Sequence, residues 1–147
     1  MAQAYPNPYL PAQFIVDYYK TYCYKRNNIQ SLYEKAAMIY RQSWKKNTPL
    51  PINQCSDSLF FSNEGDHITV LNYTILPLQF GFLIVINGQI DSPDGRQAFF
   101  NQVLQIQVFG YYRLIIADYC AFTGQPLTVQ SPTEYFDVYD SNEVANS

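Results

Sequence analysis

The sequence predicts an α+β domain in which N-terminal helices pack on one face of a curved antiparallel sheet. Apolar residues recur at helical spacing only near the N-terminus. Between residues 67 and 122, long stretches alternate with a period of two, and no helical pattern separates them. The chain has 147 residues, of which 48% are hydrophobic, so we expect one folded domain with its own core.

The first helix is expected from Pro11 to Arg26. Pro11 suits a first helical turn, and one stripe of apolar positions follows at helical spacing: Phe14, Ile15, Tyr18, Tyr19 and Tyr22. A short second helix is predicted over Ile29–Lys35, with Asn28 as its cap. A further short helix is predicted within residues 52–66.

The strands are expected where the period changes to two. A first strand should run from Ala37 to Trp44. The tetrapeptide Ser92-Pro93-Asp94-Gly95 has the residues of a tight turn. The remaining strands, the first two of them joined across Pro77, are predicted over His67–Leu76, Phe80–Ile90, Gln97–Val108 and Tyr111–Phe122.

The chain divides into three parts. Residues 1–12 are rich in proline and carry no charge, which is typical of an extended tail. Residues 13–127 form the domain. Residues 128–147 contain acidic but no basic side chains and are expected to be a mobile tail, although its aromatic residues could dock on the domain.

Composition argues against several classes of function. The net charge of −3 provides no overall attraction to nucleic acid. Cys23, Cys55, Cys120 and the single His67 lack the spacing of a metal site, so we expect reduced thiols, no metal and no cofactor. No signal peptide is apparent, and the longest apolar run is too short to span a membrane. These features predict a soluble protein of the cytoplasm, the nucleus or both.

Basic residues are concentrated near the N-terminus. Seven of the nine lie between positions 20 and 46, among aromatic residues that could stack on bases. This segment could make a weak local contact with RNA or an acidic peptide, or it could be an ordinary solvated surface. The seven are Lys20, Lys25, Arg26, Lys35, Arg41, Lys45 and Lys46.

The two faces of the predicted sheet differ in character. Along residues 97–108 one face carries core residues such as Phe100, Gln102 and Leu104, whereas the other is semi-polar but still apolar in places. A face of this kind is expected to be covered by a second domain or chain. The residues predicted to form this association face are Val85, Asn101, Val103 and Tyr119.

No convincing catalytic set stands out in the sequence. Asp118 has two interpretations: a catalytic carboxylate in a cavity, or a structural carboxylate that pairs with neighbouring groups. His67 is expected to be a solvated histidine where a loop meets the start of a strand, and Tyr18, Tyr22 and Tyr33 are expected in the core or at its rim. We therefore assign no catalytic residue.

Several segments together resemble the nuclear transport factor 2-like family over about residues 13–123. They are the first helix around Phe14–Tyr19, Leu32-Tyr33, Gly88-Gln89-Ile90, Phe100-Asn101-Gln102-Val103-Leu104 and Ala117-Asp118-Tyr119. The resemblance implies a cone of strongly curved antiparallel sheet capped by helices. It also implies dimerisation through the outer sheet face, with a second copy or with a related chain.

The resemblance also guides the functional prediction. Arg41 and Gln42 stand where the carrier branch of the family has a Trp-Glu pair, so binding of Ran–GDP is not expected. By analogy with another branch, Phe14, Leu32 and Leu127 would form a groove for short Phe-containing motifs of the nucleoporin or ribonucleoprotein type.

The predicted function is a non-enzymatic interaction and dimerisation module in nucleocytoplasmic transport or in ribonucleoprotein and mRNA-export assembly. The alternative is a small-molecule-binding protein or a lyase- or isomerase-type enzyme that uses the interior of the cone.

Overall fold

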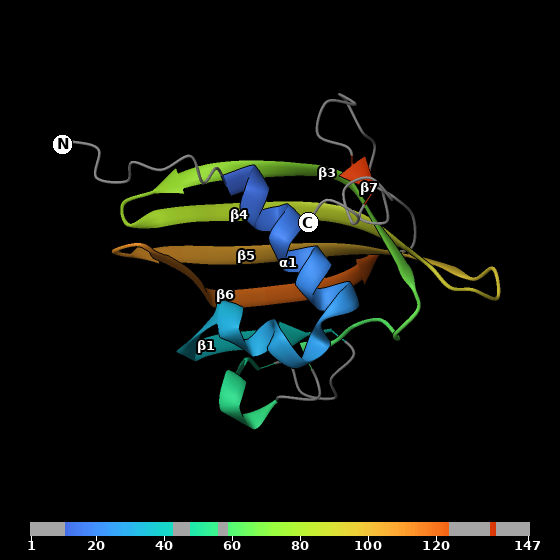
Figure 1. Cartoon of the computed structure of the whole chain (residues 1–147), viewed down its shortest axis with the longest axis horizontal. Helices are drawn as coiled ribbons and strands as arrows, with labels where there is room; N and C mark the ends of the chain where they lie inside the picture. Colours follow the sequence, from blue (N-terminus) through green and yellow to red (C-terminus); the bar gives the residue numbers. More distant parts are fainter. Residues whose placement is uncertain (1–10, 43–47, 56–58, 124–135, 138–147) are drawn as a thin grey trace.

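The computed structural model describes residues 11–42, 48–55, 59–123 and 136–137. A seven-stranded curved sheet packs against one α-helix, α1 (Pro11–Tyr24), which runs obliquely across one face of the sheet (Figure 1). We call the face toward α1 the inner face and the opposite one the outer face. The predicted α+β fold is confirmed.

Helix α1 begins at the predicted proline and buries the predicted stripe. All five of its predicted core positions are at most 2% exposed. No helix in the described part of the chain has the length and apolarity needed to cross a membrane.

The second predicted helix is wrong in type and extent. A 3-10 helix, η1 (Arg26–Leu32), follows α1, and the first strand, β1 (Tyr33–Arg41), already begins at Tyr33. Tyr33 pairs with Ile115 in the sheet, and its hydroxyl bonds to Asp118. Local spacing could not reveal these contacts, because their partners lie more than 80 positions away.

The segment after β1 contains little regular structure among its described residues. Strand β2 (Leu50–Pro51) pairs with β1, and the short 3-10 helix η2 (Ile52–Gln54) follows it. A short helix is predicted within residues 52–66; the described part of that range contains the 3-10 helix η2 and no α-helix, and residues 56–58 lie outside the described residues.

The four long strands confirm the predicted meander. They are β3 (His67–Leu78), β4 (Gly81–Asp91), β5 (Gln97–Phe109) and β6 (Tyr112–Thr123). Pro77 lies within β3, opposite Phe82, rather than between two strands as predicted. A proline is tolerated there because β3 lies near the edge of the sheet and has its long neighbour on one side only.

The strand order is β2-β1-β6-β5-β4-β3-β7. Strands β1 and β6 are parallel, so the prediction of an antiparallel sheet does not hold for this pair. Strand β7 (Phe136–Asp137) pairs with Thr69 and Val70 of β3, so two residues of the tail predicted to be mobile belong to the sheet. The N-terminal tail, apart from Pro11 and Ala12 in α1, and the rest of the C-terminal tail lie outside the described residues.

Gly88 on β4 explains one of the segments singled out in the sequence. It lies opposite Phe100 of β5, and a Cβ at position 88 would come within 2.2 Å of the Phe100 ring. That ring is 1% exposed and packs against Tyr19 and Phe61, with ring centroids 6.3 and 4.9 Å apart. The ring therefore takes the space of a side chain at position 88.

We predict that Gly88→Ala lowers the free energy of unfolding by about 1–3 kcal/mol, because the added methyl group overpacks this contact. Denaturant unfolding measures the loss. In the double variant Gly88→Ala/Phe100→Leu the smaller side chain makes room, so its loss should be less than the sum of the two single losses. Additive losses would show that the contact is not the cause.

Candidate functional site

A buried ion pair lies at the centre of the inner face. Asp118 on β6 and Arg41 at the end of β1 have side chains that are 0% and 1% exposed. Two parallel hydrogen bonds join them, from Nη1 to Oδ1 at 2.8 Å and from Nη2 to Oδ2 at 3.0 Å. This two-point geometry is among the stronger forms of charge-assisted hydrogen bonding.

All five N–H groups of Arg41 have an acceptor. Besides Asp118, the guanidinium donates from Nε and Nη2 to the carbonyl oxygen of Leu59, at 2.9 and 2.7 Å. Nη1 also donates to the carbonyl oxygen of Tyr40. The Phe61 ring lies 5.5 Å from the guanidinium carbon. Arg41 thus ties β1 to the segment before β3 as well as to β6.

The Asp118 carboxylate accepts four hydrogen bonds in total. Tyr33 donates to Oδ2 at 2.6 Å, and the Gln102 amide donates to Oδ1 at 3.0 Å. A carboxylate offers about four lone-pair sites, so its capacity is filled.

Two hydroxyls of α1 complete this buried network. Tyr19 donates to the Gln102 carbonyl oxygen at 2.5 Å, and Tyr18 accepts from the Gln102 amide at 3.0 Å. The Tyr18 and Tyr33 oxygens are 3.2 Å apart. Because Tyr33 gives its proton to Asp118, Tyr18 is the donor between the two hydroxyls. Every polar atom of the network therefore has a defined role.

Burial fixes the protonation of these groups. It raises the pKa of Tyr18, Tyr19 and Tyr33 well above the usual value for tyrosine, and the negative charge of Asp118 raises each further. For Arg41, burial alone would lower the pKa, but the charge and hydrogen bonds of Asp118 outweigh it and hold the pKa well above its usual value. The hydroxyls stay neutral and the guanidinium stays charged at neutral pH.

The polar groups of this network bond to one another and leave no site on Asp118 for a substrate. A general base needs a free lone pair near a substrate, and the contacts described above already fill those of Asp118. The geometry favours the second interpretation of Asp118, a structural carboxylate. Tyr18, Tyr22 and Tyr33 lie in the core, as expected.

The outer face has a different character. Two rows of facing residues cross it from β3 to β1. The first row is Thr74, Val85, Val103, Tyr119 and Tyr40. The second is Leu76, Leu83, Gln105, Ala117 and Met38.

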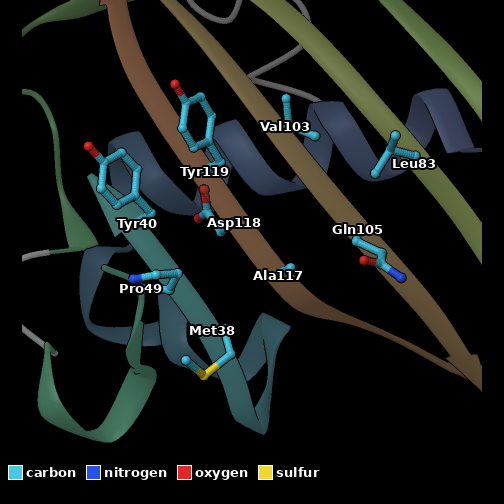
Figure 2. Close-up of a pocket in the computed structure, with 9 residues that line it drawn as sticks. All are labelled: Met38, Tyr40, Pro49, Leu83, Val103, Gln105, Ala117, Asp118 and Tyr119. Carbon is cyan, nitrogen blue, oxygen red and sulfur yellow. The ribbon is translucent and has the colours of Figure 1, made fainter. Parts of the chain in front are cut away.

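A shallow hollow of about 420 Å³ lies over β1, β6, β5 and β4 (Figure 2). Its apolar lining includes Met38, Tyr40, Leu83, Val103, Ala117 and Tyr119, and Pro49, Gln105 and Asp118 also border it. The rings of Tyr40 and Tyr119 stack at 5.2 Å with an interplanar angle of 12°.

All four residues predicted for the association face lie on this outer face. Val85, Asn101 and Val103 are half-buried and Tyr119 is 44% exposed. The sequence analysis missed Met38, Tyr40 and Leu76. The alternation along the first and third strands could have identified them, because all three share the side of the sheet opposite the core.

Exposed apolar side chains gather on this face. By strand register, six of the ten large hydrophobic residues that are exposed point outward here: Met38, Leu76, Leu78, Phe109, Tyr112 and Tyr119. From Asn72 to Leu78 on β3, and at the facing outer positions of β4, β5 and β6, no side chain is charged. Covering this part of the face would therefore not remove any charged side chain from water.

Of the three residues predicted to form the peptide groove, the structure describes Phe14 and Leu32. Phe14 is 2% exposed and packs in the core, while Leu32 is half-buried at the end of η1. Leu127 lies outside the described residues.

The basic segment is not one continuous surface, contrary to one interpretation of the sequence. Arg41 is buried with Asp118. The Arg26 guanidinium lies over the rings of Tyr22 and Phe60, at 4.9 and 4.2 Å, and Tyr22 is itself buried. Lys45, Lys46 and Trp44 lie outside the described residues. Among the described residues of this segment, Lys25 and Lys35 are exposed and Lys20 is half-exposed.

The thiols and the histidine form no cluster. Cys55 and Cys120 are buried and Cys23 is half-buried, and none is in a disulfide. Burial raises the pKa of the Cys23 thiol to about 12. His67 begins β3, at the predicted start of that strand. Within the described ranges, no group of three or more potential ligands could hold a metal ion.

This geometry is shared with proteins of known family. A family model for the nuclear transport factor 2 (NTF2) domain matches residues 11–117. No curated protein matches the chain. Nuclear transport factor 2 from Cryptosporidium parvum is 21% identical, with a TM-score of 0.62 over 76% of this chain and 90% of that one.

Two other solved structures share the fold. A ketosteroid isomerase-like protein from Parabacteroides distasonis is 12% identical, with a TM-score of 0.67 over 84% of this chain and 96% of that one. The CaMKII hub of S. rosetta is 8% identical, with a TM-score of 0.60 over 80% of this chain and all of that one. At these identities the likeness concerns the fold alone.

We predict that the two partners of the buried pair are energetically coupled. Arg41→Met or Asp118→Leu alone should lower the free energy of unfolding by about 3–5 kcal/mol, because each leaves an unpaired buried charge. The double variant should lose much less than the sum. Denaturant unfolding of all four proteins provides the comparison, and equal, additive losses would contradict the coupling.

Proposed function

The chain belongs to the nuclear transport factor 2 (NTF2) domain family, and we propose that it is a non-enzymatic association module that pairs with another chain through its outer sheet face. The observation that carries this proposal is the uncharged apolar surface around Tyr119. A contiguous exposed apolar patch on a soluble domain marks an interaction site when it exceeds a few hundred Å².

The character of the face supports a protein partner. Aromatic residues and methionine are enriched in the buried centres of protein interfaces, where charged residues are depleted. The outer face has this composition, with Met38, Tyr40 and Tyr119 beside Val103 and Leu83. Solved structures with a similar fold include a hub and an association domain of calcium/calmodulin-dependent protein kinase II type. Their names are consistent with the use of this fold for assembly.

The interior supports the non-enzymatic part of the proposal. The fold is shared with a ketosteroid isomerase-like protein, so an enzyme that uses the inner face is the competing function. Here the buried carboxylate accepts from Arg41, Tyr33 and Gln102 at all of its sites. A substrate would have to displace one of these donors to reach Asp118.

We also propose a cellular setting for the module. It would act in nucleocytoplasmic transport or in ribonucleoprotein and mRNA-export assembly, in the cytoplasm or nucleus. Ran–GDP is not among the proposed partners, because this chain lacks the Trp-Glu pair of the carrier branch and Arg41, which stands in its place, is buried. The three exposed or half-exposed lysines leave room only for a weak contact with RNA.

The first test is sedimentation of Tyr119→Glu. A charge introduced in the middle of a dry interface costs several kcal/mol when it has no partner, so the variant should sediment as a monomer at concentrations where the wild type is paired. Tyr111→Glu is the matched control: the same substitution at an 87% exposed tyrosine in the β5–β6 turn, where we expect no change in association.

Two results would contradict the proposal. One is a wild-type protein that is monomeric at high micromolar concentration and captures no partner chain from its native cell. The other is a Tyr119→Glu variant that pairs as tightly as the control.

A second prediction concerns short Phe-containing motifs. We propose that they bind near Leu32, at the end of η1, and amide chemical shifts recorded during titration with FxFG and FGDF-type peptides should move there. Phe14→Ala is not a usable test, because removing a buried Phe ring costs about 3–5 kcal/mol of stability by itself. Leu32→Ala is the better variant, since Leu32 is half-buried. Shifts confined to the outer face, or none at millimolar peptide, would reject this site.

A further inference from the structure

Two hairpin turns at one end of the sheet carry large apolar side chains. The β3–β4 turn is Gln79-Phe80, and the β5–β6 turn is Gly110-Tyr111. Both turns lie at the same end of the sheet (Figure 1), and the Phe80 carbonyl oxygen accepts from the Val108 amide at 2.8 Å. Five of the ten large hydrophobic residues that are exposed in the described part of the chain lie here. We call these five the tip patch: Leu78, Phe80, Phe109, Tyr111 and Tyr112.

The residues in these two turns are unusual. Two-residue hairpin turns favour Gly, Asn and Asp, which tolerate the backbone conformations of a tight turn. Gly110 follows this rule with a φ of 63°, whereas Phe80 and Tyr111 do not, and they are 62% and 87% exposed. The β4–β5 turn at the opposite end, Ser92-Pro93-Asp94-Gly95, is polar and has an exposed ion pair. A local rule that is broken without a gain in packing points to a functional surface.

The end of the sheet that carries the tip patch has little charge. Within residues 76–83 and 105–116 the only charged side chain is that of Arg113. Strand β1 begins beside Ile115 and adds Glu34 and Lys35, whose charges cancel. Covering this end would therefore remove few charged side chains from water.

The backbone of the two turns is also suited to leaving water. Leu78 is paired with Gly81, and Phe109 with Tyr112, so each turn has only two residues outside the strand ladder. The hydrogen bond from β5 to the Phe80 carbonyl oxygen satisfies one more polar group. Unpaired peptide groups are what make irregular backbone costly in a bilayer, and short turns keep their number small.

We propose that the tip patch binds the surface of a lipid bilayer, with Phe80 and Tyr111 at the boundary between the headgroups and the acyl chains. Aromatic side chains with a polar group, such as tyrosine, are enriched at this boundary. A bilayer accepts a protruding turn without a complementary pocket. The inference does not rest on the proposed function, because the tip patch shares no residue with the hollow on the outer face.

The charge of the chain favours a lipid partner over RNA and predicts the type of lipid. Bases stack on exposed rings, but RNA binding also needs cations for the phosphates, and this end of the sheet has no net excess of them beyond Arg113. The net charge of −3 gives no attraction to anionic headgroups. Binding would therefore come from the apolar side chains, and it should occur on neutral lipid and persist in salt.

Partition of the full chain into phosphatidylcholine vesicles, measured by co-sedimentation, tests this inference. Phe80→Ser and Tyr111→Ser should each lower the partition coefficient about tenfold, because each removes one large side chain from the apolar contact. Phe122→Ser is the matched control. It makes the same substitution at a 37% exposed phenylalanine near the opposite end of β6, and it should bind as the wild type does.

A fluorescence experiment locates the contact. Trp44 is the only tryptophan of the chain, so Trp44→Phe with Phe80→Trp places a single reporter in the tip patch. Its emission should shift to shorter wavelength when vesicles are added and should be quenched by lipids with brominated acyl chains. Trp44→Phe with Phe122→Trp should show neither effect. Thermal melting checks each fold, and the tryptophan variants keep a large ring if a serine variant fails to fold.

Three results would overturn the inference. The first is a wild-type protein that does not partition into phosphatidylcholine vesicles. The second is binding that requires phosphatidylserine and is abolished by salt, and the third is an equal loss of binding in Phe122→Ser. Tyr111→Glu separates this inference from the proposed function, because it should abolish binding to vesicles and leave association through the outer face unchanged.

Discussion

The ion pair between Arg41 and Asp118 is the interaction on which the rest of the structure depends. It joins β1 to β6 along the parallel edge of the meander, and Arg41 also holds the Leu59 segment through two hydrogen bonds. Through Gln102 the same carboxylate is linked to Tyr18 and Tyr19 of the helix. Helix, sheet and connecting segment thus meet at one buried charge pair, whose removal from water is compensated only if every bond is made.

That constraint divides the molecule into two functional environments. On the inner face the buried polar groups hydrogen-bond to one another, and Asp118 has no unused lone pair. The outer face keeps its apolar rows exposed to solvent, beside the hydrogen-bonded side chains of Asn72, Asn87 and Asn101. Because both faces come from alternating residues of the same strands, the filled interior and the open exterior arise from one pattern. The proposed association follows from the contrast between them.

The departures from prediction share a physical cause. Arg41 lies in a segment rich in basic residues, which predicts a surface position, yet its strand turns it inward beside Asp118. Tyr33 extends β1 into a segment with local helical spacing, because its partners are Ile115 and Asp118. In each case a contact distant in sequence outweighed a weak local preference.

The sequence by itself determined the α+β class, the first helix, the meander of four long strands and the identity of the two sheet faces. These features depend on the periodicity of apolar residues, which is a property of short stretches of sequence. Only the tertiary structure decided that β1 runs parallel to β6, that Arg41 is the buried partner of Asp118, and that the three asparagines align across β3, β4 and β5. Strand register and pairing partners are set by the packing of segments far apart in the chain, so no local pattern contains them.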